Sequence, residues 1–513
     1  MLLVRGLDPG LSRVLFRTSI GEGAGNRRPL FLKASADFST YPQQAGTMNG
    51  AMMQRIIGLA IATLAFSSLA GAPAAANGSA DSGGDFEQGS ARSSIDVAAL
   101  LTAARGAPPL ICSLASRSVQ GWGWGGSDAP ATPLATFASS LRRDDDFRSD
   151  ALPAEDIQRL FAGLASDDAC VRELSVRLIG TQRSEVVSSE LVARLSGADE
   201  AVRAVAALGL GLVEAPTAVD QLIRTLRDPS VDVRANSAWA LGRIENGRAL
   251  SPLVNLFTDG NEKVRQAAVA AVGRMDSTTS IAALIRVVRQ DNAASVRRVA
   301  AWALGHLEAR EAVDALAGVL AHDADAGVRE MSAWALGNIE DRRAVAALGA
   351  AIRGDAEDRV RETAVWAIGN IEDRSAIDVL AAATADRSTR VRGTAAWAIG
   401  QMDDGTRAPA GLLRLLTDES PDVRLKAAWA LGQIEDTGAL PAVRDALKAE
   451  KNDRVRRALI RALMKSGESS QETLTQLLSS SDPQIREAAV RGIAGQRAFD
   501  PWPWPWPRPR PFP

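Results

Sequence analysis

A repeat of about 31 residues runs through most of this chain and limits what it can fold into. The dipeptide Val-Arg recurs every 31 or 32 residues, with Ile485-Arg486 as a last copy 30 residues on. The ten valines are Val171, Val202, Val233, Val264, Val296, Val328, Val360, Val391, Val423 and Val455. A glycine stands nine residues after each valine from Val171 to Val423. Such regularity predicts a solenoid, in which each unit stacks only on its neighbours.

Each unit reads as two helices. In residues 340–371, the polar pair Glu340-Asp341 precedes an Ala/Leu/Val-rich stretch of about three turns. A short Gly/Asp turn follows, and a second helix begins near Val360. One helical hairpin cannot bury its apolar face alone, so neighbouring units must share a continuous core. The sequence therefore predicts an all-α solenoid of about eleven two-helix repeats.

The repeat motif is V-R-x-x-A-A-x-A-[LI]-G-x-[IM]-[ED], as in Val423–Glu435 and, with Leu307 in place of Ile or Met, in Val296–Glu308. It resembles the HEAT family, and specifically the HEAT-like repeats named after phycobilin lyases, over about residues 155–496. The resemblance implies a right-handed, armadillo-like α-solenoid behind an N-terminal helical cap. It also raises a lyase-like enzyme, or a chaperone of a cofactor protein, as an alternative function. It is weak for activity, because solenoids of this kind host many functions.

The chain divides into six regions. Residues 52–76 read as a secretory signal, with Arg55 before the apolar run 56–69 and an Ala74-Ala75-Ala76 cleavage site. This predicts export, into a bacterial periplasm. Residues 1–51 are then a non-native or disordered extension, with translation beginning at Met52 or Met53; the alternative is a genuine extension with 56–72 as a signal anchor. Residues 77–94 form a linker, 95–154 the cap region, 155–496 the solenoid and 497–513 a Pro/Trp-rich tail.

The composition limits the chemistry. Lys and Arg number 59 against 61 Asp and Glu, which argues against nucleic acid as the main partner. Two histidines, His306 and His322, and two cysteines exclude zinc fingers and iron–sulfur clusters, so we expect no metal, no cofactor and no catalytic residues. In an oxidising compartment Cys112 and Cys170 can form a disulfide at the cap; the alternative is two buried free thiols.

A row of tryptophans is the main candidate site. Counting from the valine of each Val-Arg, position +6 falls about 240° around the second helix, roughly opposite the apolar core positions. It holds Trp239, Trp302, Trp334, Trp366, Trp397 and Trp429, with Ala270 as a gap. Position +10 lies on the same face and holds Asn338, Asn370, Gln401 and Gln433 in the later repeats. Either each indole packs against the tryptophan of the neighbouring repeat, or the row binds an extended peptide, with amides contacting its backbone.

The strings Trp334–Asn338 and Trp366–Asn370 resemble the Trp-x-x-x-Asn ladder of armadillo-repeat importin alpha, which holds extended basic peptides. The resemblance covers one helix per repeat, and Gln401 and Gln433 depart from it. What it implies here is a mode of binding, not a nuclear role. The tail adds a second hypothesis: Trp502, Trp504 and Trp506 alternate with prolines and dock on a partner or on the protein's own tryptophan row. The alternative is a free tail.

Charged positions read as structural. The arginine at +1 predicts an arginine–carboxylate ladder between repeats, with Asp228, Asp232, Asp358 and Asp422 as acids. The glutamates after the second helices (Glu308, Glu340, Glu372 and Glu435) read as first-turn charges of the next helix. The favoured function is an exported, non-catalytic scaffold that binds an extended peptide or a protein along a concave Trp/Asn-Gln row. A lyase-like enzyme and a glycan or cell-wall binding module are the alternatives.

Overall fold

The computed structural model describes residues 96–107, 152–402, 407–480 and 483–493, and this part of the chain contains helices and no strand. A short helix, α2 (Val97–Ala104), precedes eleven antiparallel helix pairs. The pairs are α4 (Ala154–Gly163) with α5 (Ala169–Gly180), α6 (Glu185–Arg194) with α7 (Glu200–Leu212), α8 (Val219–Thr225) with α9 (Val231–Ile244), α10 (Leu250–Asn255) with α11 (Glu262–Arg274), α12 (Ile281–Gln290) with α13 (Ala294–His306), α14 (Val313–His322) with α15 (Ala326–Ile339), α16 (Val345–Gly354) with α17 (Asp358–Ile371), α18 (Ile377–Ala383) with α19 (Thr389–Gly400), α20 (Ala410–Arg414) with α21 (Pro421–Ile434), α22 (Leu440–Ala449) with α23 (Asp453–Lys465), and α24 (Gln471–Leu478) with α25 (Pro483–Ile493).

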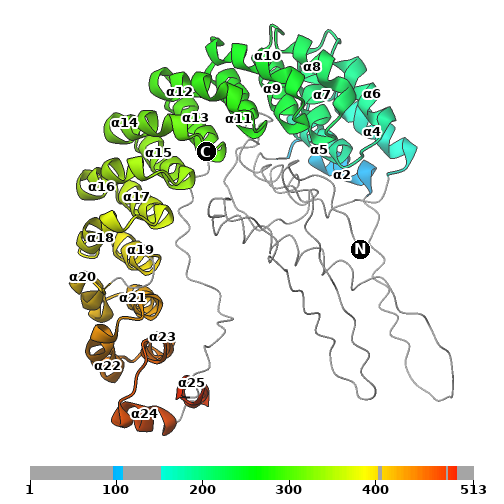
Figure 1. The fold of residues 1–513 in the computed structure, drawn as a ribbon. Helices are drawn as coiled ribbons and strands as arrows, with labels where there is room; N and C mark the ends of the chain where they lie inside the picture. The colour runs from blue at the N-terminus through cyan, green and yellow to red at the C-terminus, as the bar shows by residue number, and fades with distance from the viewer. Residues whose placement is uncertain (1–95, 108–151, 403–406, 481–482, 494–513) are drawn as a thin grey trace, which may run out of the picture. The chain divides into compact units, whose positions relative to one another are not determined.

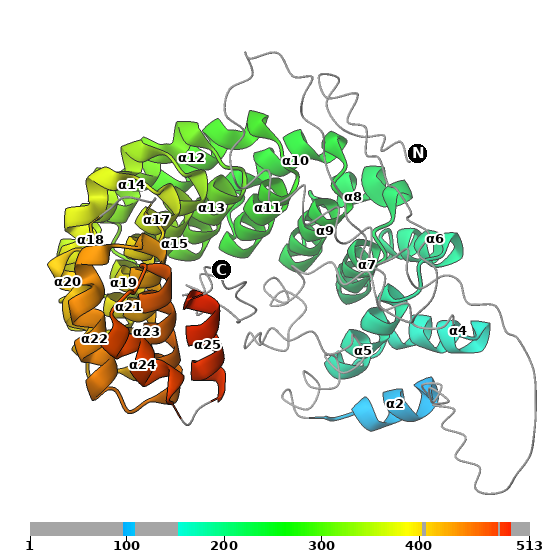
Figure 2. The same ribbon diagram turned by 60° about the horizontal axis from the view of Figure 1, so that its bottom comes forward.

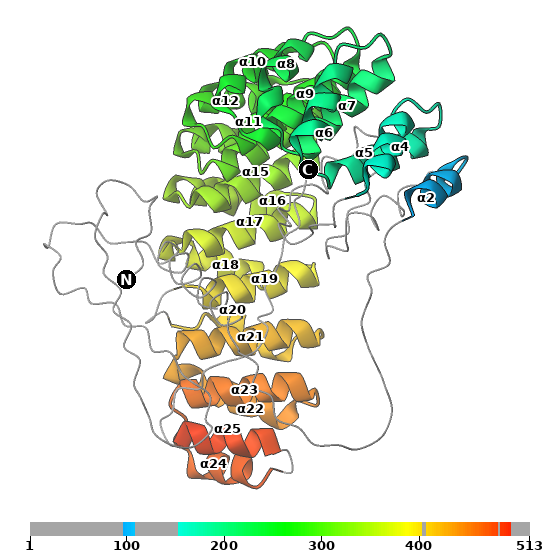
Figure 3. The same cartoon turned by 90° about the vertical axis from the view of Figure 1, so that its right-hand side faces the viewer.

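Within this solenoid the helices form two layers. The first helix of each pair lies in the outer layer and the second in the inner layer, in chain order (Figure 1). Turned views show the same succession of pairs (Figures 2 and 3), with α15 and α17 side by side in both. Each second helix packs on the second helix of the next pair. The predicted all-α solenoid of about eleven repeats is confirmed.

The repeat motif supplies the core. The valines of the Val-Arg dipeptide at Val296, Val328 and Val360 are fully buried. The alanines and leucines that follow in each second helix are buried as well, and a single apolar cluster runs from the first pair to the tenth. Small alanines let neighbouring second helices approach closely, so that each pair completes the core of the one before it.

The arginines of Val-Arg form the predicted ladder, in which each arginine joins two repeats. The Arg329 guanidinium donates to both carboxylate oxygens of Asp355 in the next repeat, with Nε to Oδ2 at 2.7 Å. Its Nη1 donates to the Asp323 carbonyl of its own loop at 2.9 Å. Asp355 in turn accepts from the backbone N–H of Glu357, which fixes the loop before α17. The same pairing recurs as Arg203–Asp228, Arg234–Asp259, Arg265–Asp291, Arg297–Asp323, Arg361–Asp386, Arg392–Asp418 and Arg424–Glu450.

Two details of the charge interpretation were wrong. Of the proposed ladder acids only Asp228 belongs to the ladder; Asp232 and Asp422 are first-turn residues of α9 and α21, and Asp358 accepts from the Ser388 hydroxyl. The acids that the arginines use stand in the loop between the two helices of the next repeat, about 25 residues downstream. A carboxylate in that loop lies next to the guanidinium of the preceding repeat, whereas a carboxylate in the first turn of the arginine's own helix does not.

The glutamates after the second helices do not start the next helix. Glu308, Glu340, Glu372 and Glu435 have φ of +49° to +55°, the left-handed conformation of a residue that ends a helix. Glycine is the usual residue there, because a Cβ atom is strained at positive φ. The chain places glutamate instead at repeat after repeat, and this backbone turn redirects the chain into the next pair.

At the N-terminal end, α2 packs on α4 and α5. Cys170, in the first turn of α5, lies in a small apolar cluster with Ala104 and Leu174. Cys170 is disulfide-bonded. Cys112, the other cysteine of the predicted bridge, lies outside the described residues, so the pairing stays a prediction.

Candidate functional site

The candidate site is the face of the second helices that is turned away from the first helices, called here the inner face. It comprises positions +2, +3, +6 and +10 of α9 to α23. The six tryptophans of the row lie here, and none of them is a fully exposed side chain. Trp239, Trp302 and Trp397 are buried, with 3–8% of their surface exposed, while Trp334, Trp366 and Trp429 are half-buried.

Each indole covers a glycine of the preceding repeat. A Cβ atom placed on Gly211, Gly273, Gly305, Gly337, Gly369 or Gly400 would lie 2.5–3.0 Å from Cζ3 of the next tryptophan. At Gly242 the next repeat offers Ala271 instead, because Ala270 replaces tryptophan there. The tryptophans therefore pack between repeats, as one of the two interpretations stated, although onto glycine rather than onto a neighbouring indole. The outer edges of Trp334, Trp366 and Trp429 still reach the surface.

The residue at +10 lies one turn beyond each tryptophan on the same face. The rings of Trp302 and His306 stack with centroids 5.3 Å apart and planes 9° apart. The Arg243 guanidinium lies 5.9 Å from the centroid of the Trp239 ring. The amides that occupy this position in later repeats, Asn338, Asn370, Gln401 and Gln433, are all half-buried. Gln433 accepts from the Lys465 ammonium at 3.4 Å. An indole and the polar side chain one turn beyond it are thus in contact in two repeats, those of Trp302 and Trp239.

Position +2 adds a row of ion pairs, one turn before the tryptophans. Glu330 of α15 lies 3.5 Å from Arg359 of α17, and Glu362 of α17 accepts from Arg390 Nε of α19 at 2.7 Å. The carboxylates are recessed, with 16% and 13% of the side chains exposed, whereas Arg359 and Arg390 are 47% and 62% exposed. Burial raises the pKa of Glu330, against the opposing charge of Arg359. In both ion pairs the carboxylate is the more buried partner and the guanidinium the more exposed one.

Two cations flank these pairs. Lys426 of α21 forms no hydrogen bond or ion pair with any residue that the structure describes; its Nζ lies 3.2 Å from where a Cβ atom of Gly393 would stand. Burial lowers the pKa of Lys426, against the charges of Glu362 and Asp422. At the other end, Arg298 of α13 leans over Gly327, and its buried Nε has no hydrogen-bond partner among the described residues.

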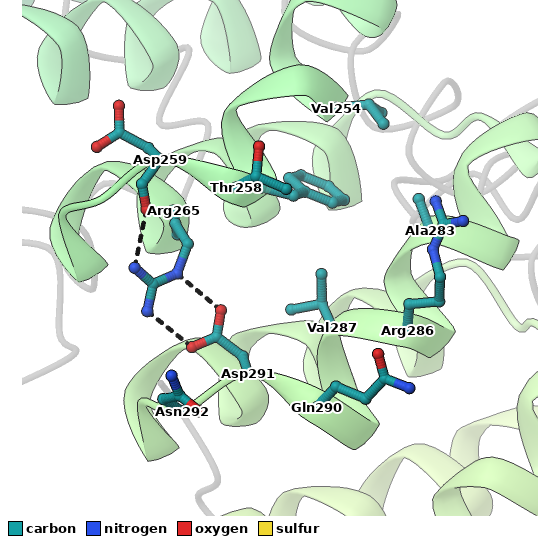
Figure 4. Close-up of a pocket in the computed structure, with 11 residues that line it drawn as sticks. Val254, Thr258, Asp259, Arg265, Ala283, Arg286, Val287, Gln290, Asp291 and Asn292 are labelled. Atoms are coloured by element: carbon teal, nitrogen blue, oxygen red, sulfur yellow. Dashed lines mark hydrogen bonds and ion pairs between the residues drawn. The ribbon is translucent and has the colours of Figure 1, made fainter.

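A separate pocket lies in the outer layer, between the first helices α10 and α12. Figure 4 shows one side of it closed by the ion pair of Arg265 and Asp291, which belongs to the ladder between repeats. Arg286 and Gln290 stand at another side. The pocket is lined by Val254, Phe257, Thr258, Asp259, Arg265, Ala283, Arg286, Val287, Gln290, Asp291 and Asn292. Arg265 and Asp291 already pair with each other and join two repeats, so they are not available to a ligand in this pocket. The inner face is therefore the stronger candidate site.

Sequence reasoning found the tryptophan and amide rows. It missed Arg390 and Lys426, and it missed that Glu330, which lies near Arg298, pairs with Arg359. The signal available in the sequence was the arginine just before the valine, at Arg359 and Arg390, together with the glutamate at position +2, Glu330 and Glu362. His306 and His322 belong to no group of metal-binding side chains within the described residues. No helix in the described part of the chain is long and apolar enough to cross a membrane. Trp502, Trp504 and Trp506 lie outside the described residues, as does the predicted signal.

Comparisons with known proteins agree with this architecture. The profile of HEAT repeats matches residues 188–273, 219–305, 281–362, 345–418 and 409–494. Among solved structures, a crystal structure of importin beta is similar with a TM-score of 0.52 at 13% identity, over 78% of this chain and 69% of that one. Kap95p, solved in a study of its binding to RanGDP, gives a TM-score of 0.47 at 15% identity, over 78% of this chain and 66% of that one.

An engineered protein covers 67% of this chain and 99% of its own length, with a TM-score of 0.38 and 20% identity. No curated protein matches the sequence. The HEAT-repeat matches span residues 188–494, more than half of the chain, and the same residues form consecutive helix pairs joined by a shared core. The chain therefore belongs to the HEAT-repeat family.

Proposed function

We propose that this protein is an exported, non-catalytic scaffold that binds an extended polypeptide along the inner face of its solenoid. The observation that carries the proposal is a three-residue pattern repeated in register on neighbouring helices. On α15 it reads Glu330, Trp334, Asn338, and on α17 it reads Glu362, Trp366, Asn370. In each case the three side chains are spaced one helical turn apart and half-buried.

The spacing of the pattern suits an extended chain. Packed helices lie about 8–10 Å apart, and a polyproline II chain advances about 9.3 Å per three residues. Such a ligand would meet one indole edge and one amide in each repeat. The indole gives a flat apolar wall, and the amide donates to and accepts from the peptide backbone. Many weak contacts in series would supply the affinity.

The amides offer the cleanest test. The tryptophans pack on glycines, so their truncation would disturb the stacking of repeats. Asn338→Ala with Asn370→Ala removes peptide-facing groups without opening that contact. We expect the double variant to weaken binding of a labelled neutral Pro-rich peptide, measured by fluorescence anisotropy, by about tenfold, since two hydrogen bonds of about 0.5–1.5 kcal/mol each are lost. Asn255→Ala with Asn292→Ala, at exposed positions outside the inner face, is the matched control. Equal affinities of the two double variants would refute the proposal.

The tail is a part of the proposal that can be tested separately. Docking of Trp502, Trp504 and Trp506 on the inner face would make the tail a ligand that other peptides must displace. Deleting residues 500–513 should then tighten binding of an added peptide, whereas unchanged affinity would leave the tail as a free segment. Glu330 and Glu362 already have arginine partners, so contact by the tail would depend on its indoles rather than on Arg508 and Arg510.

The alternatives keep weaker support. A lyase-like enzyme or cofactor chaperone rests on the resemblance to phycobilin-lyase repeats alone. A glycan-binding module would use the same indole edges, since tryptophan faces also stack on sugars, but it would not require Asn338 and Asn370 for a peptide backbone. Oligosaccharide binding that is insensitive to the double asparagine variant would favour it.

A further inference from the structure

The inner face carries a surplus of positive charge. Cations occupy positions +2, +3, +6 and +10 of α9 to α23 far more often than acids do. The cations are Arg243, Arg274, Arg298, Lys426, Arg457, Arg461 and Lys465, and the acids are Glu330 and Glu362. Both acids are recessed and paired with arginines of the next repeat. What the face presents to a ligand is therefore cationic.

Two cations of this face have no ion-pair partner among the described residues. Arg298 and Lys426 stand at the two ends of the ion-pair row, on α13 and α21, and neither has an ion pair among the described residues. Other cations of the face are engaged: Arg243 donates to Glu214 at 2.6 Å, and Arg274 lies 3.9 Å from Glu245. An unpaired, partly desolvated cation is costly in the free protein, and an incoming carboxylate removes that cost.

Neighbouring carboxylates lie within electrostatic range of the two cations but form no ion pair with them. Glu362 acts on Lys426 and Glu330 on Arg298, but these carboxylates pair with Arg390 and Arg359. Asp422, on the first turn of α21, is exposed and stands one turn before Lys426, where its charge acts on the ammonium without forming an ion pair. Asp358 of α17 accepts from the Ser388 hydroxyl at 3.1 Å. On α23 the positions of the pattern become Arg457, Arg461 and Lys465, so the face grows more basic where the tryptophan row ends.

We propose that the polypeptide bound on the inner face is acidic, with carboxylates that meet Lys426 and Arg298 while its backbone follows the indole and amide rows between them. This rests on the proposed peptide-binding function and deepens it. Five consecutive second helices, α13 to α21, separate the two cations, which at about 8–10 Å per helix corresponds to a segment of roughly 32–40 Å. Arg359 and Arg390, exposed above their glutamates, lie along the same path.

The test compares three labelled peptides of equal length, built from Pro-Pro-Glu, Pro-Pro-Gln and Pro-Pro-Lys repeats, on the full chain. We expect the acidic peptide to bind about tenfold tighter than the neutral one, and the basic peptide to bind more weakly than either. Added salt should weaken binding of the acidic peptide and leave binding of the neutral peptide nearly unchanged.

Two substitutions locate the effect. Lys426→Gln and Arg298→Gln should each lower the affinity for the acidic peptide several-fold and leave the affinity for the neutral peptide unchanged. Lys448→Gln, which removes one exposed charge from α22 in the outer layer, is the matched control. Circular dichroism melting of each variant establishes that the solenoid is intact. Because neither side chain holds an ion pair with any residue that the structure describes, both variants should fold as the parent does.

The outcomes separate the two proposals. Equal binding of acidic and neutral peptides, tighter binding of the basic peptide, or equal effects of Lys426→Gln and Lys448→Gln would each overturn the acidic preference while peptide binding itself stands. Failure of all three peptides would remove the proposed function and the acidic preference together. Binding of an acidic polyuronate oligosaccharide in place of the acidic peptide would overturn the choice of a polypeptide.

Discussion

The indole of Trp366 covers Gly337 of the preceding repeat so closely that a Cβ atom on the glycine would lie 2.9 Å from Cζ3 of the ring. The same atom would lie 2.8 Å from Cα of Ala367, which is backbone and cannot rotate away. The glycine nine residues after each Val-Arg is therefore a contact residue between repeats rather than a helix-ending signal.

Gly337→Ala should destabilise the solenoid for this reason. The helices α15 and α17 would have to separate, at a cost of about 1–3 kcal/mol, visible as a lower midpoint of thermal or urea unfolding. Gly318→Ala is the matched control, because it lies inside the outer helix α14 with nothing within 4 Å of the added atom. That change should stabilise the protein by roughly 0.5–1 kcal/mol. Two variants that shift the midpoint in the same direction would contradict the packing role.

The ladder between repeats makes a second prediction. Arg329 and Asp355 are 15% and 7% exposed, and the guanidinium also holds a loop carbonyl of its own repeat. Arg329→Ala would leave a recessed carboxylate without its partner, and should lower the free energy of unfolding by about 2–3 kcal/mol. Arg342→Ala, at an arginine 82% exposed and 3.8 Å from Asp373, should change it by less than about 1 kcal/mol. Similar losses from the two substitutions would count against the ladder.

The same carboxylates set the response to acid. Burial alone would raise the pKa of Asp355, but hydrogen bonds from Arg329 and the backbone N–H of Glu357, with the charges of Arg329 and Arg361, outweigh it and hold the pKa below its usual value. The pKa is lowered likewise at Asp228, Asp259, Asp323, Asp386, Asp418 and Glu450. A carboxyl with a lowered folded-state pKa contributes stability above its unfolded value, about 3.9 for aspartate, and loses it as pH falls through the folded-state pKa.

Unfolding midpoints should therefore be nearly constant from about pH 7 to 5 and fall steeply below about pH 4. Asp355→Asn gives the internal check. Its deficit relative to the parent should be full near neutral pH and shrink in acid, because the parent loses the same ionised group there. A deficit that stays constant down to the acid transition would mean that Asp355 acts by packing alone.

The sequence predicted the pairing of helices and the arginine ladder because both follow from one repeat. The Val-Arg period places each arginine at the same point of each unit, and the periodic alanines identify the buried side. Packing of the indoles between repeats was one of two interpretations, but the sequence did not predict which of them are buried. A helical wheel treats one helix at a time, so it could not single out Trp239, Trp302 and Trp397. Whether an indole is covered depends on the side chains of neighbouring helices. The glycine contact alone does not decide it, since Gly305, Gly337 and Gly400 make the same contact with the half-buried tryptophans.

The ion pairs of the inner face escaped prediction for a related reason. Glu330 meets Arg359, 29 positions later, whereas the ladder arginines meet acids about 25 positions later. Offsets of this kind depend on the length of each loop and on the lateral shift between neighbouring helices. The unpaired state of Lys426 follows from the same shift, since Gly393 rather than an acid stands opposite its amine. The periodicity shows which residues share a face but not which of them come into contact across it.

The left-handed glutamates give the last prediction. Glu435 ends α21 at φ +55°, is exposed, and accepts or donates no side-chain hydrogen bond among the described residues. Glu435→Gly removes the strain of a Cβ atom at positive φ, about 1–2 kcal/mol, and adds about 0.5–1 kcal/mol of unfolded-chain entropy. The net expectation is a stabilisation of roughly 0.5–1 kcal/mol in urea unfolding. Glu435→Ala keeps the Cβ atom and the strain, so it should give no stabilisation. If alanine stabilises as much as glycine does, the glutamate side chain itself, rather than its backbone conformation, is the source of the effect.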